Sequence, residues 1–206
     1  MLETVWAVRH GERADVADPS WADRADRVHD PPLTDFGRWQ AWRVGRRLSA
    51  TGVPFDAVYA SPFLRAVETA DEICREIDRS VRLEPGLGEH RNPAWFDAEP
   101  TLLPEAALVD RFDPVCTADE PVIVPEFPED HDAAERRVAA TTRGLADRHA
   151  GDEHLLVVGH GLTIGGVVRG LVGSTEWVDA PLAGITRIDR RGDDWHLAYS
   201  GDTFHC

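Results

Sequence analysis

Thr4-Val5-Trp6-Ala7-Val8-Arg9-His10-Gly11-Glu12-Arg13 is the stretch around which the chain is organised. It begins as a short apolar run rich in β-branched residues, which indicates a buried strand, and Gly11 ends that run. Ligands of open α/β sheets bind beyond the carboxyl ends of the strands, so Arg9, His10 and Arg13 would stand where chemistry is usually done. The pattern favours a phosphate pocket that contains a nucleophilic imidazole. Taken alone, it is equally compatible with a hydrogen-bonded core histidine and a solvated turn.

The bulk composition predicts a single acidic domain. With 206 residues, 42% of them hydrophobic, residues 1–206 can build one sizeable core. The formal charge is −15, from 37 acidic against 22 basic residues, and the chain contains no lysine. Such a chain repels nucleic acids and anionic membranes, so neither is an expected partner. An acidic, lysine-free composition suits a salt-accumulating halophile, although a GC-rich genome would also replace lysine with arginine.

The sequence shows neither a disulfide framework nor a targeting segment. The three cysteines, Cys74, Cys116 and Cys206, are odd in number and widely spaced, which predicts no disulfide network and no zinc knuckle. The N-terminus enters the first predicted strand without a basic region, and no apolar run is long enough to span a bilayer. We therefore expect a cytoplasmic protein.

The first predicted helix follows an irregular segment. Thr34 is predicted to cap one helix that Gly52 ends, with Trp39 and Trp42 beside its buried face as packing residues rather than ligand platforms. Residues 14–32, before this helix, show no lasting period and are predicted to form a loop near the pocket.

Arg65 follows the second predicted strand, residues 55–59. Ser61-Pro62 is predicted to start a helix with its apolar face along residues 66–77, so Arg65 falls in the first turn. The helix dipole favours anions at that end, and an arginine there is better explained if both serve a bound anion. The alternative is a surface ion pair between Arg65 and Glu68.

Glu89 follows a third, short strand over residues 81–83. Glycines and a proline surround it in Glu84-Pro85-Gly86-Leu87-Gly88-Glu89-His90, a tight loop that could aim its carboxylate inward or leave it on the surface. The proline-rich segment 90–130, with a short helix over 104–112, is too long for a plain connector and is predicted to be a lid or specificity insertion.

The last third of the chain repeats the opening geometry. A strand over residues 154–159 ends at the glycine-flanked His160, as the first strand ends at His10. The other elements predicted there are helices over 134–149 and 162–171 and a hairpin of strands over 183–189 and 195–199.

Four signals now fall at strand ends or helix starts of one α/β pattern: the Arg9-His10-Gly11 motif, Arg65, Glu89 and His160. Phosphoryl transfer needs cations on the equatorial oxygens, an in-line nucleophile and a proton for the leaving oxygen. This set has a candidate for each role, and none of the roles requires a metal.

The chain resembles the histidine phosphatase, or phosphoglycerate mutase-like, superfamily. The resemblance rests on Arg9-His10-Gly11-Glu12-Arg13, Ser61-Pro62-xx-Arg65, Glu84-Pro85-Gly86-Leu87-x-Glu89 and Gly159-His160, in the family's order. With Asp15 and the Asp30-to-Thr34 segment, it is most similar to the phosphatase domain of suppressor of T-cell receptor signalling proteins. The resemblance implies a three-layer α/β/α sandwich with a mostly parallel sheet, a phosphohistidine intermediate and no cofactor.

The resemblance also implies a role for each site residue. His10 would attack phosphorus as a neutral imidazole, which nearby arginines favour by lowering its pKa. His160 would be a charged donor to the same phosphoryl group, and Glu89 would protonate the leaving oxygen and then deprotonate water. The guanidiniums that would hold the non-bridging oxygens are those of Arg9, Arg13 and Arg65.

Substrate choice stays open between a small phosphorylated metabolite and a phosphoprotein, and the chain could form a homodimer. Around the acid, Gly88 and His90 stand where these relatives carry an aromatic residue on one or both sides. A mutase would show Ser-x-Trp-Asn after the Arg-His-Gly, where this chain has Arg13-Ala14-Asp15-Val16. A phosphotransferase of the mutase type and a phosphate-binding module without turnover remain as alternatives.

Other phosphate-related classes fit the sequence less well. Gly159-x-Gly161-xxx-Gly165 is spaced like a dinucleotide loop, but His160 would stand where the pyrophosphate needs bare backbone. No cysteine is followed by arginine at the spacing of a cysteine-based phosphatase, and closely spaced His and Asp pairs of a metallophosphoesterase are missing.

Overall fold

The computed structural model describes residues 1–116 and 120–205, so Cys206 lies outside the described residues. Its elements in chain order are β1 (Thr4–Arg9), α1 (Ala14–Ala17), η1 (Trp21–Asp23), α2 (Asp35–Ser49), β2 (Ala57–Ala60), α3 (Leu64–Ile77), β3 (Val81–Leu83), η2 (Pro85–Leu87), α4 (Glu105–Arg111), β4 (Val115–Cys116), α5 (His131–Arg148), β5 (His154–Gly159), α6 (Gly161–Val172), β6 (Ile185–Arg191) and β7 (Asp194–Asp202).

The strands of the described residues form one seven-stranded sheet in the order β4-β3-β2-β5-β1-β6-β7. The strands from β4 to β1 in that order run parallel, whereas β6 pairs antiparallel with both β1 and β7. The predicted mostly parallel sheet and the C-terminal hairpin are therefore confirmed. The order also makes β1 and β5 neighbours, although about 150 residues separate them in the chain.

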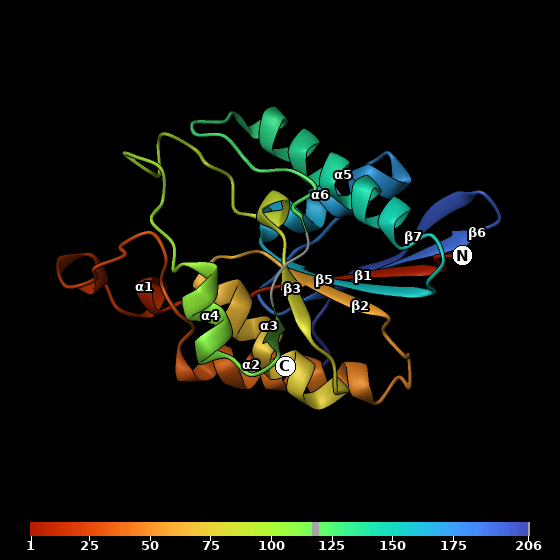
Figure 1. Ribbon diagram of the computed structural model, residues 1–206, viewed down its shortest axis with the longest axis horizontal. Helices are drawn as coiled ribbons and strands as arrows, with labels where there is room; N and C mark the ends of the chain where they lie inside the picture. The colour runs from red at the N-terminus through yellow and green to blue at the C-terminus, as the bar shows by residue number, and fades with distance from the viewer. Residues whose placement is uncertain (117–119, 206) are drawn as a thin grey trace.

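Two helical layers enclose the sheet, as predicted for a three-layer sandwich. In Figure 1, α2 and α3 lie on one face and α5 and α6 on the other. Strand β1 contributes to both cores, because Trp6 and Val8 pack on the α2–α3 side and Val5 and Ala7 on the α5–α6 side. Burial of both faces explains why this strand reads as a continuous apolar run rather than an alternating one.

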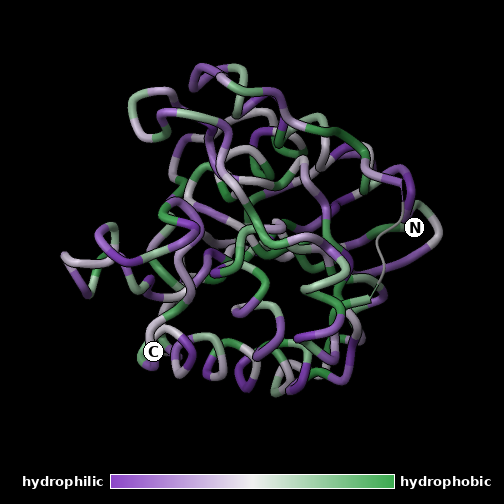
Figure 2. Tube along the Cα trace, turned by 60° about the vertical axis from the view of Figure 1, so that its left-hand side comes forward, coloured by the Kyte–Doolittle hydropathy of each residue, from purple (hydrophilic) through white to green (hydrophobic). Residues whose placement is uncertain are grey.

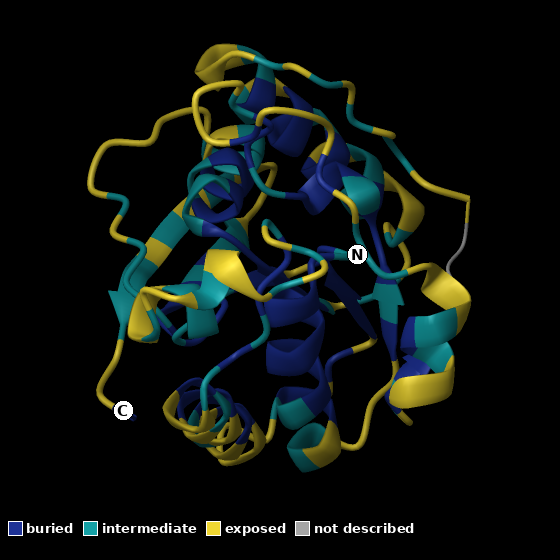
Figure 3. Cartoon of the chain, turned by 90° about the vertical axis from the view of Figure 1, so that its left-hand side faces the viewer, coloured by how far each residue is buried: buried dark blue, intermediate teal, exposed yellow. Residues whose placement is uncertain are grey.

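Hydrophobic and buried positions follow this layering. The hydrophobic residues gather along the central strands, and the outlying loops are mainly hydrophilic (Figure 2). The central strands are buried between helices whose outer surfaces are exposed (Figure 3). Among the described helices, none is long and apolar enough to cross a membrane.

Several element boundaries differ from the sequence predictions. Thr34 does cap α2, accepting a hydrogen bond from the Gly37 amide at 2.9 Å. However, α3 begins at Leu64 rather than at Ser61-Pro62. Ser61 lies outside the helix, and its hydroxyl contacts His160 in the site described below. The predicted loop 14–32 contains the short helices α1 and η1.

The expectation for the two tryptophans of α2 also needs correction. Trp39 and Trp42 are 40% and 37% exposed, so they lie at the outer surface of α2 rather than in the core. There they stack with the guanidiniums of Arg43 and Arg46. The two cysteines within the described residues, Cys74 and Cys116, are free, in agreement with the expectation of no disulfide network.

A close approach of two glycines fixes the end of β1 against the start of α2. A Cβ atom on Gly11 would lie 2.5 Å from the Gly37 carbonyl oxygen, and one on Gly37 would lie 2.2 Å from the Glu12 carbonyl oxygen. Neither position tolerates a side chain without a backbone shift. The Gly11 amide also donates to the Thr69 hydroxyl at 3.2 Å, which ties the same turn to α3.

Candidate active site

Parallel pairing brings the two predicted histidines together. Arg9 at the end of β1 is in register with Gly159 at the end of β5, and the His10 amide donates to the Gly159 carbonyl at 2.9 Å. His10 and His160, the next residues of the two strands, therefore emerge side by side, with ring centroids 5.4 Å apart. Strand β2 pairs with the other edge of β5, which places Ser61 and the start of α3 next to them.

The His10 ring has the tautomer and environment of a nucleophile. Its Nδ1 lies 2.8 Å from the Gly11 carbonyl oxygen, which can only accept, so Nδ1 carries the proton and Nε2 the lone pair. Within the described residues, the buried Nε2 has no hydrogen-bond partner. Burial, then the charge of Arg65 and the proximity of His160, hold the pKa of His10 well below its usual value. His10 is therefore neutral near pH 7 and its Nε2 is free to attack.

Arg65 and Arg9 present unpaired N–H groups at this point. Arg65 is only 1% exposed and donates from Nη2 to Glu89 at 3.2 Å, while its Nε and Nη1 lack partners among the described residues. Arg9 donates from Nη1 to the Ala180 carbonyl at 2.6 Å and has an unpartnered Nε. Burial lowers the pKa of both guanidiniums. Buried, unpaired cationic donors are costly, so their presence indicates a site for an anion.

Arg13 lies at the cavity but is held differently from the other two arginines. Its Nε and Nη2 donate to the two carboxylate oxygens of Asp15 at 3.0 and 2.9 Å. This fork-to-fork pair occupies the bidentate face of Arg13 that the sequence argument assigned to phosphate. In this structure Arg9 and Arg65 carry the unpaired donors, and Arg13 lies among the lining residues as an ion pair.

His160 is completely buried between a hydroxyl and a carboxylate. Its Nε2 lies 2.8 Å from the Ser61 hydroxyl and its Nδ1 lies 3.3 Å from Glu89 Oε2. Burial lowers the pKa of His160 to about 4, although Glu89 acts in the opposite direction. The imidazole is therefore neutral at neutral pH in this structure, which differs from the charged donor implied by the family resemblance. A phosphate dianion beside it would favour its protonated form.

Glu89 points inward and joins these groups, which settles the alternative of a surface carboxylate. Its side chain is 14% exposed and its Oε2 lies 3.2 Å from Arg65 Nη2. Burial acts to raise the pKa of Glu89, but the close contacts with His160 and Arg65 outweigh it, so the pKa lies well below its usual value. The alternative pairing of Arg65 with Glu68 is wrong, because Glu68 binds Arg38 and Arg111 instead.

The same cluster also offers the donor atoms of a metal site. Donor atoms of His10, Glu89 and His160 lie within 4.8 Å of one another, and two imidazoles with a carboxylate are a common metal-ligand set. However, Arg65 lies in direct contact with Glu89 and places a fixed positive charge where the cation would bind. The set therefore fits an anion better than a metal ion, and no catalytic step is derived through a metal.

A cavity of about 560 Å³ opens above these groups. Arg9, Arg13, Arg65 and Glu89 line its inner part. Its outer part is lined by residues of the 28–31 and 90–96 segments and by Gly161, Leu162 and His131. Both segments project from the side of the sheet where β1 and β5 end (Figure 1).

Sequence reasoning missed several residues that shape this site. Ser61 was expected at a helix start and quoted within the family motif without a role of its own, yet its hydroxyl contacts His160. Arg137 of α5 donates to the carbonyl oxygens of Gly86 and Gly88 at 2.8 and 3.1 Å, behind the Glu89 loop. No local pattern marked Arg137, since it stands among the apolar positions of a long helix.

Comparisons with known proteins agree with this arrangement. The family model of the histidine phosphatase superfamily (branch 1) matches residues 5–203. The ecdysteroid-phosphate phosphatase of Bombyx mori is 36% identical in an alignment of 117 residues that covers 43% of this chain and 18% of that protein. The ubiquitin-associated and SH3 domain-containing protein A of Mus musculus is 34% identical over 129 residues, covering 48% of this chain and 20% of that one.

The chain thus spans about a fifth of the length of these two curated relatives. Among solved structures, the ecdysone phosphate phosphatase of Bombyx mori in complex with tungstate superposes with a TM-score of 0.81 at 24% identity. The superposition covers 95% of this chain and 92% of that one, which establishes the shared fold.

Proposed function

We propose that this chain, which belongs to the histidine phosphatase superfamily, hydrolyses phosphomonoesters through a phosphohistidine formed on His10. The observation that carries the proposal is the unpartnered, buried Nε2 of a neutral His10 beside the unpaired N–H groups of Arg65 and Arg9. This geometry supplies a nucleophile and the donors for phosphoryl oxygens in one cluster.

In the first step, the His10 Nε2 lone pair forms the P–N bond while the P–O bond to the leaving group breaks. Glu89 gives its proton to the leaving oxygen, so an alcohol or phenol departs. The substrate dianion adds negative charge beside Glu89, which raises the pKa of that carboxyl from its low value in the free enzyme. Arg9 and Arg65 neutralise the equatorial oxygens during the transfer.

In the second step, water attacks phosphorus and gives its proton to the Glu89 carboxylate. The P–N bond breaks and its electron pair returns to Nε2, so inorganic phosphate leaves and both residues recover their starting protonation states. The Gly11 carbonyl holds the proton on Nδ1 throughout, at 2.8 Å. A positioned acid and base of this kind contributes about 10²–10⁴-fold to the rate.

The test is hydrolysis of p-nitrophenyl phosphate by the purified chain in the presence of a chelator. We expect turnover, its loss in His10→Ala, and no change in the control His196→Ala, whose side chain lies on an exposed face of β7. Quenching during turnover in an alkaline denaturant should trap phosphate on His10 as a base-stable adduct that acid then releases. A fully active His10→Ala would refute the mechanism.

We further propose a cytoplasmic enzyme that acts on a small phosphoester or a phosphoprotein and has no nucleic-acid or membrane partner. The formal charge of −15 supports the exclusion of polyanionic partners. A homodimer stays a prediction that sedimentation would test. A mutase would transfer the phosphoryl group to an added alcohol acceptor, whereas we expect transfer to water alone.

A further inference from the structure

We propose that the outer part of the cavity binds a flat, uncharged ring system as the leaving group of the substrate, a subsite that rests on the proposed phosphatase function. The cavity lined by Arg9 and Arg65 is also lined by residues of two loops, the 28–31 and 90–96 segments. Five of the side chains that line it are rings, those of His29, His90, Trp95, Phe96 and His131. A leaving group attached to a phosphate on Arg65 would lie among them.

The rings are held in two edge-to-face groups. His29 lies against Phe96 with centroids 4.9 Å apart, and His90 lies against both Trp95 and His131 at 5.3 and 5.7 Å. His90 is anchored by a 3.1 Å hydrogen bond from its Nε2 to the Glu129 carbonyl oxygen. Such pairs prefer offset or perpendicular contacts with further rings, so the lining is ordered for an aromatic or flat apolar guest.

Trp95 is the ring with the most surface available to a guest. It is 58% exposed although its neighbour Phe96 is 7% exposed. An indole that lies at the mouth of a cavity while keeping over half of its surface uncovered can contribute a large, rigid contact area when a ligand covers it. Val28, Pro31 and Leu162 add apolar surface to the same lining.

The charges around the subsite disfavour a leaving group that carries a carboxylate. Of the arginines that line the cavity, Arg9 and Arg65 present their free donors to the phosphate, and Arg13 is held bidentately by Asp15. His29 is engaged with Asp97 at 3.4 Å. Once the phosphate occupies Arg9 and Arg65, a glycerate-like or serine-like carboxylate would therefore find no further unpaired guanidinium within the described lining of this cavity.

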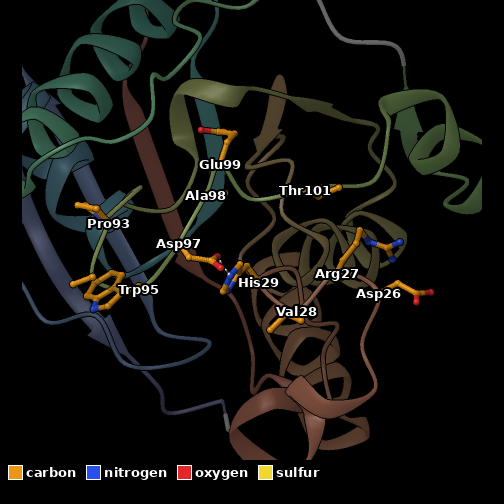
Figure 4. Close-up of a pocket in the computed structure, with 11 residues that line it drawn as sticks. Asp26, Arg27, Val28, His29, Pro93, Trp95, Asp97, Ala98, Glu99 and Thr101 are labelled. Carbon is orange, nitrogen blue, oxygen red and sulfur yellow. Dashed lines mark hydrogen bonds and ion pairs between the residues drawn. The ribbon is translucent and has the colours of Figure 1, made fainter.

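A second cavity of about 540 Å³ continues the subsite past His29 and Trp95. The two cavities share Val28, His29 and Trp95, and Figure 4 shows the Asp97 carboxylate next to the His29 ring in the lining of the second one. Its remaining lining has three acidic side chains, those of Asp26, Asp97 and Glu99, against the single guanidinium of Arg27, which lies 3.7 Å from the Asp30 carboxylate. The far end of an elongated leaving group should accordingly be neutral or cationic, because an anion would meet these carboxylates.

The experiment compares esters that share a primary alkoxide leaving group, so that differences report binding rather than leaving-group chemistry. Ethyl phosphate, 2-phenylethyl phosphate and 2-(2-naphthyl)ethyl phosphate form the ring series, and O-phosphoserine is the charged comparator. We expect KM to fall along the ring series by roughly 3- to 10-fold for each step of added ring contact. O-phosphoserine should have a KM no lower than ethyl phosphate.

The variant Trp95→Ala removes the exposed ring without touching the phosphate-binding groups. It should raise KM for the naphthyl ester by roughly 3- to 10-fold and leave KM and kcat for ethyl phosphate unchanged. Trp177→Ala is the matched control, because Trp177 is 84% exposed and is absent from the lining of both cavities. When 2-phenylethyl phosphate carries a substituent at the far end of its ring, a carboxylate there should give a higher KM than an aminomethyl group.

Two results would overturn the subsite: equal KM values along the ring series, or an equal effect of Trp95→Ala on ethyl and naphthyl esters. If no ester is turned over at all, the proposed function fails instead. Binding of the naphthyl ester by titration calorimetry, with and without Trp95→Ala, then decides the subsite on its own. Loss of affinity in the variant would support it, and unchanged affinity would refute it.

Discussion

Replacing Arg137 with glutamine should slow hydrolysis of alkyl phosphates far more than hydrolysis of aryl phosphates. Arg137 is 7% exposed and donates to the carbonyl oxygens of Gly86, Gly88 and Glu89 at 2.8, 3.1 and 3.3 Å. It thereby fixes three backbone positions at and before Glu89, the proposed catalytic acid. Glu129 holds the other edge of the guanidinium, at 3.0 Å from Nε.

The stability cost follows from the same contacts. The Glu129 side chain is 8% exposed, so removing the guanidinium leaves a buried carboxylate without its cation. Breaking a buried pair in this way costs about 3–5 kcal/mol of unfolding free energy. In the double variant Glu129→Gln/Arg137→Gln the stranded charge disappears, and we expect part of the stability to return. The three carbonyl oxygens remain without their donor in both variants.

The catalytic cost comes from displacement of Glu89. Misplacing a catalytic group by about 1 Å costs up to about 10²-fold in rate, so we expect kcat for ethyl phosphate to fall by roughly 10- to 100-fold. For p-nitrophenyl phosphate the phenolate leaves with little help, and the loss should stay within a few-fold. KM should change little, because Arg9 and Arg65 are not moved.

The assay measures kcat and KM for both esters in the wild type, the single variant and the double variant, with urea denaturation alongside. If Arg137 only stabilises the fold, the double variant will recover stability and activity together, and both esters will respond alike. That outcome would refute the positioning role. Recovery of stability while the alkyl-specific loss in kcat persists would support it.

Four further outcomes are expected. Glu89→Gln should reduce kcat for alkyl phosphates more than for aryl phosphates, and equal losses would count against Glu89 as the acid. Burial lowers the pKa of His160 from 6.5 to about 4, so the unfolded chain binds more protons than the folded chain between those two pH values. The unfolding free energy should therefore decrease by about 3 kcal/mol from this group as the pH falls through that window. In urea titrations at several pH values, His160→Asn should flatten the slope of unfolding free energy against pH. Inorganic phosphate at 100 times its Kd should raise the unfolding free energy by about 2.7 kcal/mol, and Arg65→Leu should remove most of that gain. A chelator should leave the turnover rate unchanged, and restoration of a lost rate by added zinc would contradict the metal-free mechanism.

Local patterns predicted the elements and the inner site well. The apolar run before His10 and the one before His160 became β1 and β5, and the glycine-rich loop did aim Glu89 inward. These features are local, because the residue that follows a buried strand, here His10 after β1 and His160 after β5, stands at the sheet edge whatever the rest of the chain does. Arg65 was recognisable for a similar reason, as a cation at a helix start that favours anions.

The remaining features depend on contacts between distant segments. The ring-lined subsite needs His29 of one loop beside Phe96 of another, and neither loop has a periodic pattern that predicts its path. The Asp15 carboxylate that holds Arg13 was visible in the sequence only as part of a family motif. The role of Arg137 could be predicted only by knowing that α5 packs behind η2, and the sequence of α5 does not indicate that contact.

The pairing of β1 with β5 explains why the two histidines needed no sequence proximity. In a parallel pair each residue has a fixed partner, and here Val8 faces Val158 and Arg9 faces Gly159. Successive side chains of a strand point to opposite faces, so a slip of one residue would move Val8 and its alternating neighbours out of their core on both sides of the sheet. The burial of β1 on two faces therefore sets the register, and the register sets the 5.4 Å between the rings of His10 and His160. The catalytic geometry is in this sense a consequence of core packing several residues away from the chemistry.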